Sequence, residues 1–481
     1  MDRHLNYIAG HWTPPESGSY YQTRNPARPT EVLGEFPCST EVDVDLALAA
    51  AQKARENWAD TPAPQRAAIL VRFSQLLADS QSELARIVTL EQGKALQEST
   101  GEIARASAEA SFSAGEALRL CGNTFPSERA GFNCYTILEP LGVVAAITPW
   151  NFPVVAPVRK IVPALACGNT VVLKPASLTP WSAVQITKVA EKAGLPAGVL
   201  NLIIGTGSTL GDRLISDPRV RGISFTGSTA VGARINECAA RRMAKVQLEL
   251  GGKNPAIVLE CDDLDEAARE IVAAAFLCSG QRCTALSRVL VEESLADDLV
   301  VRLRLRILNV RIGNGLDPAT TMGPLISREQ METVARYVSI GKEGGAKLVV
   351  GGQSLVKDAE QEGYFYAATL FDHVAPDSPL ALEEIFGPVL PVIRVRDADE
   401  AFRRANATRY GLAASLFTRN QHVVREFLRR VECGMAHINH GTASQAHVPF
   451  GGVKDSGQGA FSIGPTVKDA FTNTKTVYVK T

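Results

Sequence analysis

The chain of 481 residues is long enough for two large domains with an appendage, and its 45% hydrophobic and 21% charged residues are ordinary for a globular protein. The formal net charge of −1 gives no overall attraction to polyanions, so neither nucleic acid nor a membrane surface is an expected partner. No apolar run approaches the ~18 residues of a membrane span, and residues 1–12 lack the apolar stretch of a signal peptide.

Nine cysteines, an odd number at scattered positions, form no C-x-x-C pair and no regular framework. This pattern predicts reduced thiols and hence a cytoplasmic protein. His437 and His440 stand three residues apart and could share a helix face, but no third ligand lies near them in the sequence. No metal site is therefore expected.

Short strands and turns are predicted over residues 5–36, where four prolines interrupt apolar pairs, and helices are predicted from Thr40 onward. Apolar residues at helical spacing define the inward faces of the first two helices. These residues are Val42, Leu46, Ala49, Ala50, Ala54 and Trp58 in the first helix, and Ile69, Phe73, Leu76 and Leu77 in the second, which begins near Pro62. A third helix starts with a capping box of Ser80 and Glu83 and runs to about Gln92.

From Leu141 onward, short β-rich runs alternate with helical segments at the spacing of βαβ units. The predicted strands span 142–147, 170–173, 200–204, 222–225, 246–250, 256–259 and 288–291, and a terminal strand spans 475–480. Near-continuous apolar strands with crossover helices predict parallel sheets that are covered on both faces. The fold class is therefore α/β, and ligands are expected at the carboxyl ends of the strands.

One cysteine stands on a predicted turn that favours a role as a nucleophile. Cys283 follows a predicted Ala-rich helix over 264–277, and Ser279-Gly280 breaks the helical pattern just before it, so a turn presents the thiol. A presented thiol can serve as a nucleophile in its thiolate form. The alternative is a packed core residue, because free cysteine is among the most buried residue types.

Five short motifs are predicted where strands end. They are Pro149-Trp150-Asn151-Phe152-Pro153, Lys174-Pro175-Ala176, the glycine-bearing turn 225–232, Glu249-Leu250-Gly251-Gly252-Lys253-Asn254-Pro255, and Glu383-Glu384-Ile385-Phe386-Gly387-Pro388. Asn151 offers an amide donor, Lys174 a cation for a ribose or phosphate, and Glu249 a carboxylate. The turn can cradle a phosphate with backbone N–H groups, although it is not a G-x-G-x-x-G. Each motif alone also occurs as an ordinary connection or surface charge.

Together with Gln281-Arg282-Cys283, in this order and spacing, these motifs resemble the NAD(P)-dependent aldehyde dehydrogenase superfamily. The resemblance covers essentially the whole chain, from Leu90-Glu91-Gln92-Gly93-Lys94 through Pro449-Phe450-Gly451-Gly452 to the terminal strand. It implies a Rossmann-like cofactor domain over 1–120 and 141–250 and an α/β catalytic domain over 251–452. It also implies a small β oligomerisation extension over 121–140 and 453–481, in a homodimer or homotetramer.

The resemblance further implies a mechanism. Cys283 attacks an aldehyde, and the Asn151 amide and the Cys283 backbone N–H hold the oxyanion; one such donor is typically worth about 10²–10³ in rate. Hydride passes to the nicotinamide and leaves a thioester. Glu249 activates water against that thioester, so the expected product is a free acid with no need for coenzyme A.

The implied cofactor is NAD or NADP. Lys174 and Glu384 would hold its riboses, Ser228 its pyrophosphate, and Phe386 would lie near the nicotinamide. The full set of expected cofactor residues is Trp150, Lys174, Ser177, Gly227, Ser228, Gly232, Leu250, Glu384 and Phe386. Ser177 stands where NAD-preferring members commonly have Glu, so NADP should be accepted.

The predicted substrate is a small anionic semialdehyde. Arg159 matches in position an Arg with which succinate-semialdehyde and α-ketoglutaric-semialdehyde dehydrogenases hold the substrate's distal carboxylate. Such enzymes often carry a second Arg six residues before the nucleophile, where this chain has Leu277. The expected substitutes near the pocket mouth are Arg282, Ser444 and His447.

Other functions stay open at this point. A neutral aliphatic or aromatic aldehyde is the alternative substrate. A cysteine hydrolase would need a His base that no motif supplies, and a non-catalytic scaffold could keep the same fold.

Overall fold

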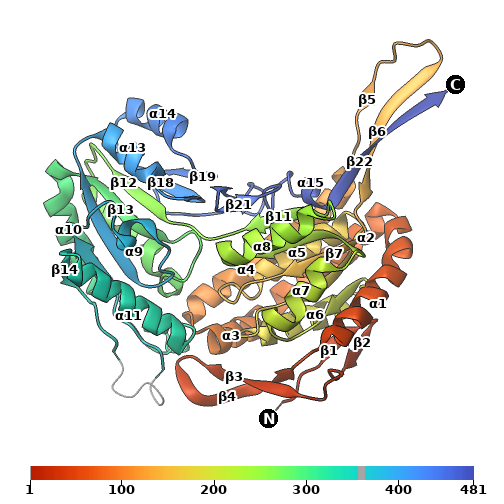
Figure 1. The fold of residues 1–481 in the computed structure, drawn as a ribbon, viewed down its shortest axis with the longest axis horizontal. Coiled ribbons are helices and arrows are strands. Elements are labelled where there is room, and N and C mark those ends of the chain that lie inside the picture. The colour runs from red at the N-terminus through yellow and green to blue at the C-terminus, as the bar shows by residue number, and fades with distance from the viewer. Residues whose placement is uncertain (1, 356–362) are drawn as a thin grey trace.

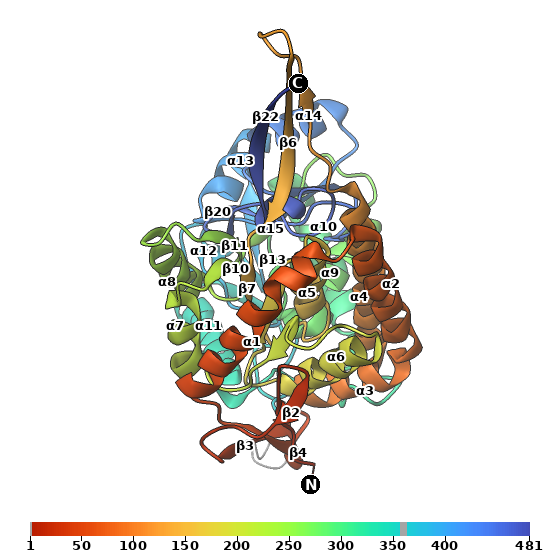
Figure 2. The same ribbon diagram turned by 90° about the vertical axis from the view of Figure 1, so that its right-hand side faces the viewer.

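Two mostly parallel sheets form the body of the protein, in a computed structural model that describes residues 2–355 and 363–481 (Figures 1 and 2). The first sheet has eight strands in the order β2-β1-β9-β8-β7-β10-β11-β21. Its parallel centre consists of β7 (Val143–Ile147), β8 (Thr170–Lys174), β9 (Leu200–Leu202), β10 (Val220–Thr226) and β11 (Lys245–Glu249). Antiparallel strands at its edges are β1 (Asn6–Ile8), β2 (His11–Thr13) and β21 (Gly457–Gln458).

The central strands of this sheet are buried on both faces. Val144 and Ala146 of β7 belong to one hydrophobic core, whereas Val143 and Ala145 belong to another. This alternation is what a strand covered from both sides requires. The helices of this half are α1 (Glu41–Asp60), α2 (Ala63–Asp79), α3 (Gln81–Gln92), α4 (Leu96–Glu116), α5 (Val155–Ala166), α6 (Pro180–Lys192), α7 (Gly207–Ser216) and α8 (Thr229–Ala240).

The second sheet has seven strands in the order β14-β15-β16-β13-β12-β18-β19. These are β14 (Lys347–Val350), β15 (Thr369–Asp372), β16 (Val389–Val395), β13 (Leu286–Glu292), β12 (Asn254–Val258), β18 (Ala413–Phe417) and β19 (Met435–Ile438). β14 pairs antiparallel with β15, and the other neighbours are parallel. Its helices are α9 (Leu264–Phe276), α10 (Glu293–Ile307), α11 (Arg328–Glu343), α12 (Pro379–Leu382), α13 (Ala398–Asn406) and α14 (Gln421–Arg430).

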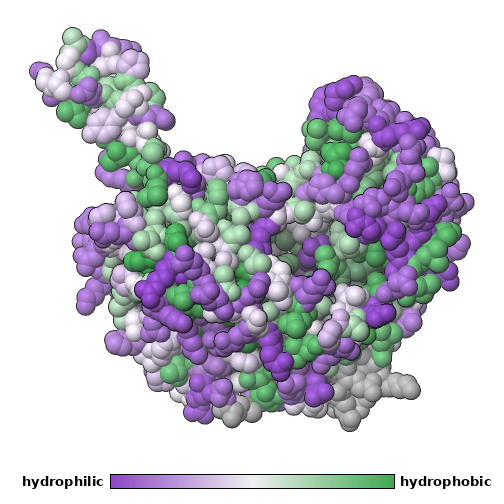
Figure 3. Space-filling model, turned by 180° about the vertical axis from the view of Figure 1, so that it is seen from behind, coloured by the Kyte–Doolittle hydropathy of each residue, from purple (hydrophilic) through white to green (hydrophobic). Residues whose placement is uncertain are grey.

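A β arm projects from the body (Figures 1 and 3). It consists of β5 (Thr124–Phe125), β6 (Phe132–Pro140) and β22 (Thr472–Lys480). Strands β6 and β22 pair antiparallel along their full length, with Phe132 opposite Lys480 and Pro140 opposite Thr472. The smaller elements are β3 (Tyr20–Asn25), β4 (Arg28–Pro37), β17 (Tyr410–Gly411), β20 (Val453–Lys454), α15 (Lys468–Phe471) and the 3₁₀ turns 117–119 and 277–280. Within the described residues, no helix combines the length and apolar character needed to cross a membrane.

The predicted strands agree with the structure to within three residues at each end, and each predicted helix exists. The predicted inward face of α1 was wrong. Val42 and Leu46 are about half exposed, whereas the buried residues are Asp43, Val44, Ala47, Leu48, Ala51 and Trp58. Helix α1 has apolar residues around most of its circumference, so its packing on β8 and α7 selects the buried stripe.

Two smaller predictions were also wrong. Ser80 makes no side-chain capping bond, because it is at once the residue that ends α2 and the one that precedes α3. The motif 383–388 lies between α12 and the start of β16, not after a strand. His437 lies on β19 and not on a helix. The division of the chain into a cofactor domain, a catalytic domain and an oligomerisation extension stays a prediction. Strand β21 lies in the range assigned to the oligomerisation extension, but it pairs with β11 of the first sheet.

Candidate active site

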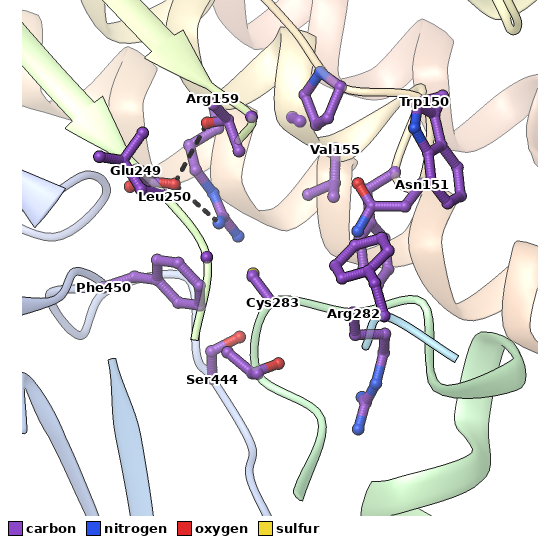
Figure 4. Close-up of a pocket in the computed structure, with 18 of the residues that line it drawn as sticks. Trp150, Asn151, Val155, Arg159, Glu249, Leu250, Arg282, Cys283, Ser444 and Phe450 are labelled. Carbon is purple, nitrogen blue, oxygen red and sulfur yellow. Dashed lines mark hydrogen bonds and ion pairs between the residues drawn. The ribbon is translucent and has the colours of Figure 1, made fainter. Parts of the chain in front are cut away.

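A cavity of about 550 Å³ gathers most of the predicted site residues around Cys283 (Figure 4). The predicted residues that line it are Trp150, Asn151, Arg159, Gly227, Ser228, Glu249, Leu250, Arg282, Cys283, Glu384, Phe386 and Ser444. The predicted residues outside this lining are Lys174, Ser177, Gly232 and His447. The His447 ring instead lies near Phe112 of α4, with 6.5 Å between ring centroids.

A strained turn presents the thiol. Helix α9 ends at Phe276, and Cys278, Ser279 and Gly280 then adopt positive φ angles of 55°, 57° and 71°. Such angles are costly for residues other than glycine, and strain of this kind persists only where surrounding contacts enforce it. A Cβ on Gly280 would lie 2.3 Å from the carbonyl oxygen of Gly387, so only glycine fits there.

Amide side chains fix the backbone of this turn. Asn254 donates through Nδ2 to the carbonyl oxygens of Cys283, at 2.7 Å, and Ala285, at 2.8 Å. Asn151 donates through Nδ2 to the Gln281 carbonyl at 2.8 Å. A primary amide has two N–H groups, so Asn151 can bind the turn and still offer a donor to a ligand.

A buried ion pair holds the Asn151 loop in place. Lys94 donates through Nζ to the Asn151 carbonyl at 2.6 Å and to Glu102 Oε2 at 2.7 Å. Glu102 Oε1 accepts the backbone N–H groups of Val154 and Val155, where α5 begins. This carboxylate therefore caps the helix that carries Arg159. The sequence motif pointed to Lys94, but not to Glu102, whose role depends on the packing of α4 against α5.

Burial determines the resting state of the nucleophile. It raises the pKa of the Cys283 thiol to about 12, and the carboxylates of Glu249 and Glu384 act in the same direction. The guanidinium groups of Arg159 and Arg282 oppose the rise. The thiol is therefore protonated at neutral pH.

Glu249 is held at the cavity wall by polar contacts (Figure 4). It ends β11, and its residue surface is 5% exposed. Ser462 Oγ donates to Oε1, Thr226 Oγ1 donates to Oε2 at 3.5 Å, and Arg159 Nη1 lies 3.9 Å from Oε2. Ser462 was missed in the sequence, where a lone serine carries no signal. It reaches the site because its segment pairs with Phe450.

Arg159 reaches from α5 toward Cys283 (Figure 4). Its Nε and Nη2 donate to the two carboxylate oxygens of Glu109, at 2.9 and 2.7 Å, and its guanidinium lies 4.5 Å from the centroid of the Phe450 ring. Burial lowers the pKa of Arg159, but Glu109 and Glu249 outweigh it and the net pKa is raised. Arg159 is thus a fixed, permanent cation of the cavity.

Arg282 is less available than predicted. Its Nη2 donates to the Ala274 carbonyl of α9 at 2.7 Å, and Figure 4 shows the guanidinium turned away from the Cys283 sulfur. Burial lowers the pKa of Arg282, with the nearby carboxylate of Glu98 opposing that effect. Arg282 therefore acts on the Cys283 thiol through its charge, which lowers the pKa of the thiol.

The predicted cofactor residues form a donor set suited to a dinucleotide. Lys174 is buried at the end of β8, donates to the Pro175 carbonyl at 3.0 Å, and has its pKa lowered to about 8 by burial. Ser228 caps α8, whose N-terminal N–H groups suit a pyrophosphate. Gly232 of α8 packs on Leu250, where a Cβ would lie 2.4 Å from the leucine side chain.

A carboxylate and two aromatic rings complete this set. Glu384 Oε1 accepts the Gly252 N–H at 2.9 Å, and a Cβ on Gly251 would lie 2.2 Å from Glu384 Oε2, so glycine lets the carboxylate lie against the backbone. The rings of Trp150 and Phe386 meet edge to face, 5.4 Å between centroids. A cation, a helix N-terminus and a carboxylate are the groups that phosphates and ribose hydroxyls need, so the residues fit a nicotinamide dinucleotide.

Known proteins resemble the chain over nearly its full length. The aldehyde dehydrogenase family matches residues 12–477. The α-ketoglutaric semialdehyde dehydrogenase of Bacillus subtilis is 40% identical over 100% of this chain and 99% of its own length. The glutarate-semialdehyde dehydrogenase of Pseudomonas putida is 38% identical, over 95% and 94% respectively. An NADP-dependent enzyme of E. coli has a solved structure with a TM-score of 0.96 and 36% identity, covering 100% of this chain and 98% of that chain.

Proposed function

The chain belongs to the aldehyde dehydrogenase family, and on this premise we propose that it oxidises a small anionic semialdehyde to the free carboxylic acid. The predicted family and fold are thereby confirmed, and the enzyme is an NAD(P)-dependent aldehyde dehydrogenase. The observation that carries the substrate proposal is the position of Arg159, a buried cation that lines the same cavity as Cys283.

Cys283 acts first. Its thiol releases its proton to solvent water, aided by the charges of Arg159 and Arg282, and the sulfur bonds to the aldehyde carbon. The carbonyl electrons move to oxygen, which accepts from the second N–H of Asn151 and from the Cys283 backbone N–H. Lys174, Glu384 and the N-terminus of α8 would hold NAD(P)⁺, which when bound would supply the acceptor for the hydride that leaves that carbon.

Glu249 acts second. A water molecule that attacks the thioester carbon must lose a proton, and Glu249 is the carboxylate positioned to accept it. Collapse of the tetrahedral intermediate breaks the carbon–sulfur bond and returns the thiolate. The product is a free acid, and coenzyme A is not required.

Cofactor selectivity is expected to depend on Ser177. The Tyr21 hydroxyl donates to the Ser177 carbonyl at 2.9 Å, which fixes the loop after β8. A Glu side chain at this position would repel a 2′-phosphate, so Ser177→Glu should lower the ratio of kcat/KM with NADP to kcat/KM with NAD about ten- to a hundred-fold. Ser177→Ala is the matched control and should change the ratio far less. An unchanged ratio in Ser177→Glu would exclude this role.

The substrate class is tested by a panel of four aldehydes. We expect kcat/KM for succinate semialdehyde and α-ketoglutaric semialdehyde to exceed that for butanal and benzaldehyde by about ten-fold or more, because a charge-assisted contact contributes about 1.5–3 kcal/mol. Both relatives named above are semialdehyde dehydrogenases, which supports the choice of panel. Higher kcat/KM for the neutral aldehydes would replace this proposal with the alternative of a neutral substrate.

We also propose that the protein is cytoplasmic and forms a homodimer or homotetramer through the β arm. Exposed apolar side chains on the arm support association: Phe125, Ile137, Tyr478 and Val479 are 38–71% exposed. Strand β22 also presents an edge that another chain could pair with. Light scattering should give two or four times the chain mass of 51.5 kDa. A mass of one chain would contradict the proposal.

A further inference from the structure

Two arginines of the cavity share one carboxylate. Arg105 of α4 donates through Nε to Glu109 Oε1 at 2.7 Å, and Arg159 of α5 binds both oxygens of the same group. Both arginines line the cavity, and the Glu109 side chain is only 1% exposed. The nearest further carboxylate is Glu249, 3.9 Å from Arg159 Nη1. The Arg105–Glu109–Arg159 cluster contains two cations and one carboxylate, so it carries one surplus positive charge, which Glu249 partly offsets at Arg159.

Arg105 also has hydrogen-bonding capacity that the protein does not use. Its Nη1 donates to the backbone carbonyl of Ser444, a residue of the cavity lining. Its Nη2 is buried and has no hydrogen-bond partner among residues 2–355 and 363–481. A buried donor without an acceptor is unfavourable, and a carboxylate is a stronger acceptor than a backbone carbonyl. An anion entering the cavity can therefore compete with Ser444 for this guanidinium.

We propose that Arg105 is the second cationic anchor for the distal anionic group of the substrate, supplied from α4 in place of the arginine that position 277 lacks. This inference rests on the proposed function. Leu277 begins the turn before the nucleophile, and the Arg282 guanidinium binds the backbone of α9, so neither position supplies this charge. Glu109 is a positioning residue, because it holds both guanidinium groups at the cavity wall.

The fit of a short semialdehyde follows from the surrounding side chains. Phe152, Val155 and Phe450 line the same cavity and suit a hydrocarbon spacer. In the view of Figure 4, Arg159 and Ser444, the residue that Arg105 binds, lie on either side of Cys283. The ligand class is therefore an aldehyde with a carboxylate a few carbons from the reacting carbon.

The test compares two aldehydes of similar length, succinate semialdehyde and pentanal, in wild type, Arg105→Gln and Arg105→Lys. Arg105→Gln removes the charge and should lower kcat/KM for succinate semialdehyde about ten- to a hundred-fold, mainly through KM, with little change for pentanal. Arg105→Lys keeps a charge and should recover part of the loss. Arg119→Gln is the matched control, because Arg119 pairs with Glu116 on the exposed end of the same helical segment.

Equal losses for both aldehydes in Arg105→Gln, or no loss for either, would overturn the role of Arg105. If Arg105→Gln does not fold, Arg105→Lys decides: its smaller loss must be confined to the anionic substrate. The comparison of the two aldehydes in wild type tests the proposed function separately from the role of Arg105. A wild-type preference for pentanal would overturn the proposed function itself, whereas an undiminished preference for the semialdehyde in Arg105→Gln would overturn only this inference.

Discussion

Glu249→Gln should reduce about one equivalent of NAD(P) per active site in a rapid burst and then turn over about 10²–10⁴-fold more slowly than wild type. The carboxylate is required as a base only when water attacks the thioester. It also raises the pKa of Cys283, so its replacement by a neutral amide favours the thiolate and should not hinder acylation. The glutamine can still accept from Ser462, which keeps the local structure.

Stopped-flow absorbance of the reduced nicotinamide measures both phases. Glu237→Gln, which changes an exposed residue of α8, is the matched control and should behave as wild type. Undiminished steady turnover in Glu249→Gln would remove Glu249 from deacylation. Loss of the burst together with turnover would place its role before hydride transfer instead.

Cys283→Ala should lose both burst and turnover, by a factor on the order of 10⁴ or more, because removal of a covalent nucleophile eliminates the step on which the others depend. Cys283→Ser tests the same point with almost no change in volume, and a hydroxyl is a far weaker nucleophile. Fluorescence titration with reduced cofactor should show that both variants still bind it. Cys238→Ala, at a partly buried cysteine of α8 outside the cavity lining, should retain full activity.

The sequence predicted most of the sheet framework and the reactive centre, because these depend on short contiguous runs. The strand 143–147 is apolar throughout and is bounded by turn residues, so its type and limits follow from composition. Cys283, Asn151 and Glu249 stand in motifs at the ends of elements, and the fold brings all three into one cavity. Their roles in catalysis stay predictions.

The polar network behind these residues could not be predicted. Glu109 and Arg159 are 50 positions apart, and only the packing of α4 on α5 makes them a bidentate pair. In the sequence, Arg105 and Glu109 are indistinguishable from an ordinary surface cation and an ordinary surface anion. The prediction of the inward face of α1 was wrong for a related reason. The composition of this helix allows several buried faces, and tertiary contacts select one of them.

The most direct test of the account is the site of acylation. Glu249→Gln, mixed with NAD(P)⁺ and succinate semialdehyde and quenched in acid after the burst, should carry one succinyl group as a thioester. Proteolysis and mass spectrometry should find it on the peptide that contains Cys283, and on none of the peptides with the other eight cysteines. An acyl group on another residue, or a full burst without an acyl-enzyme, would contradict Cys283 as the nucleophile.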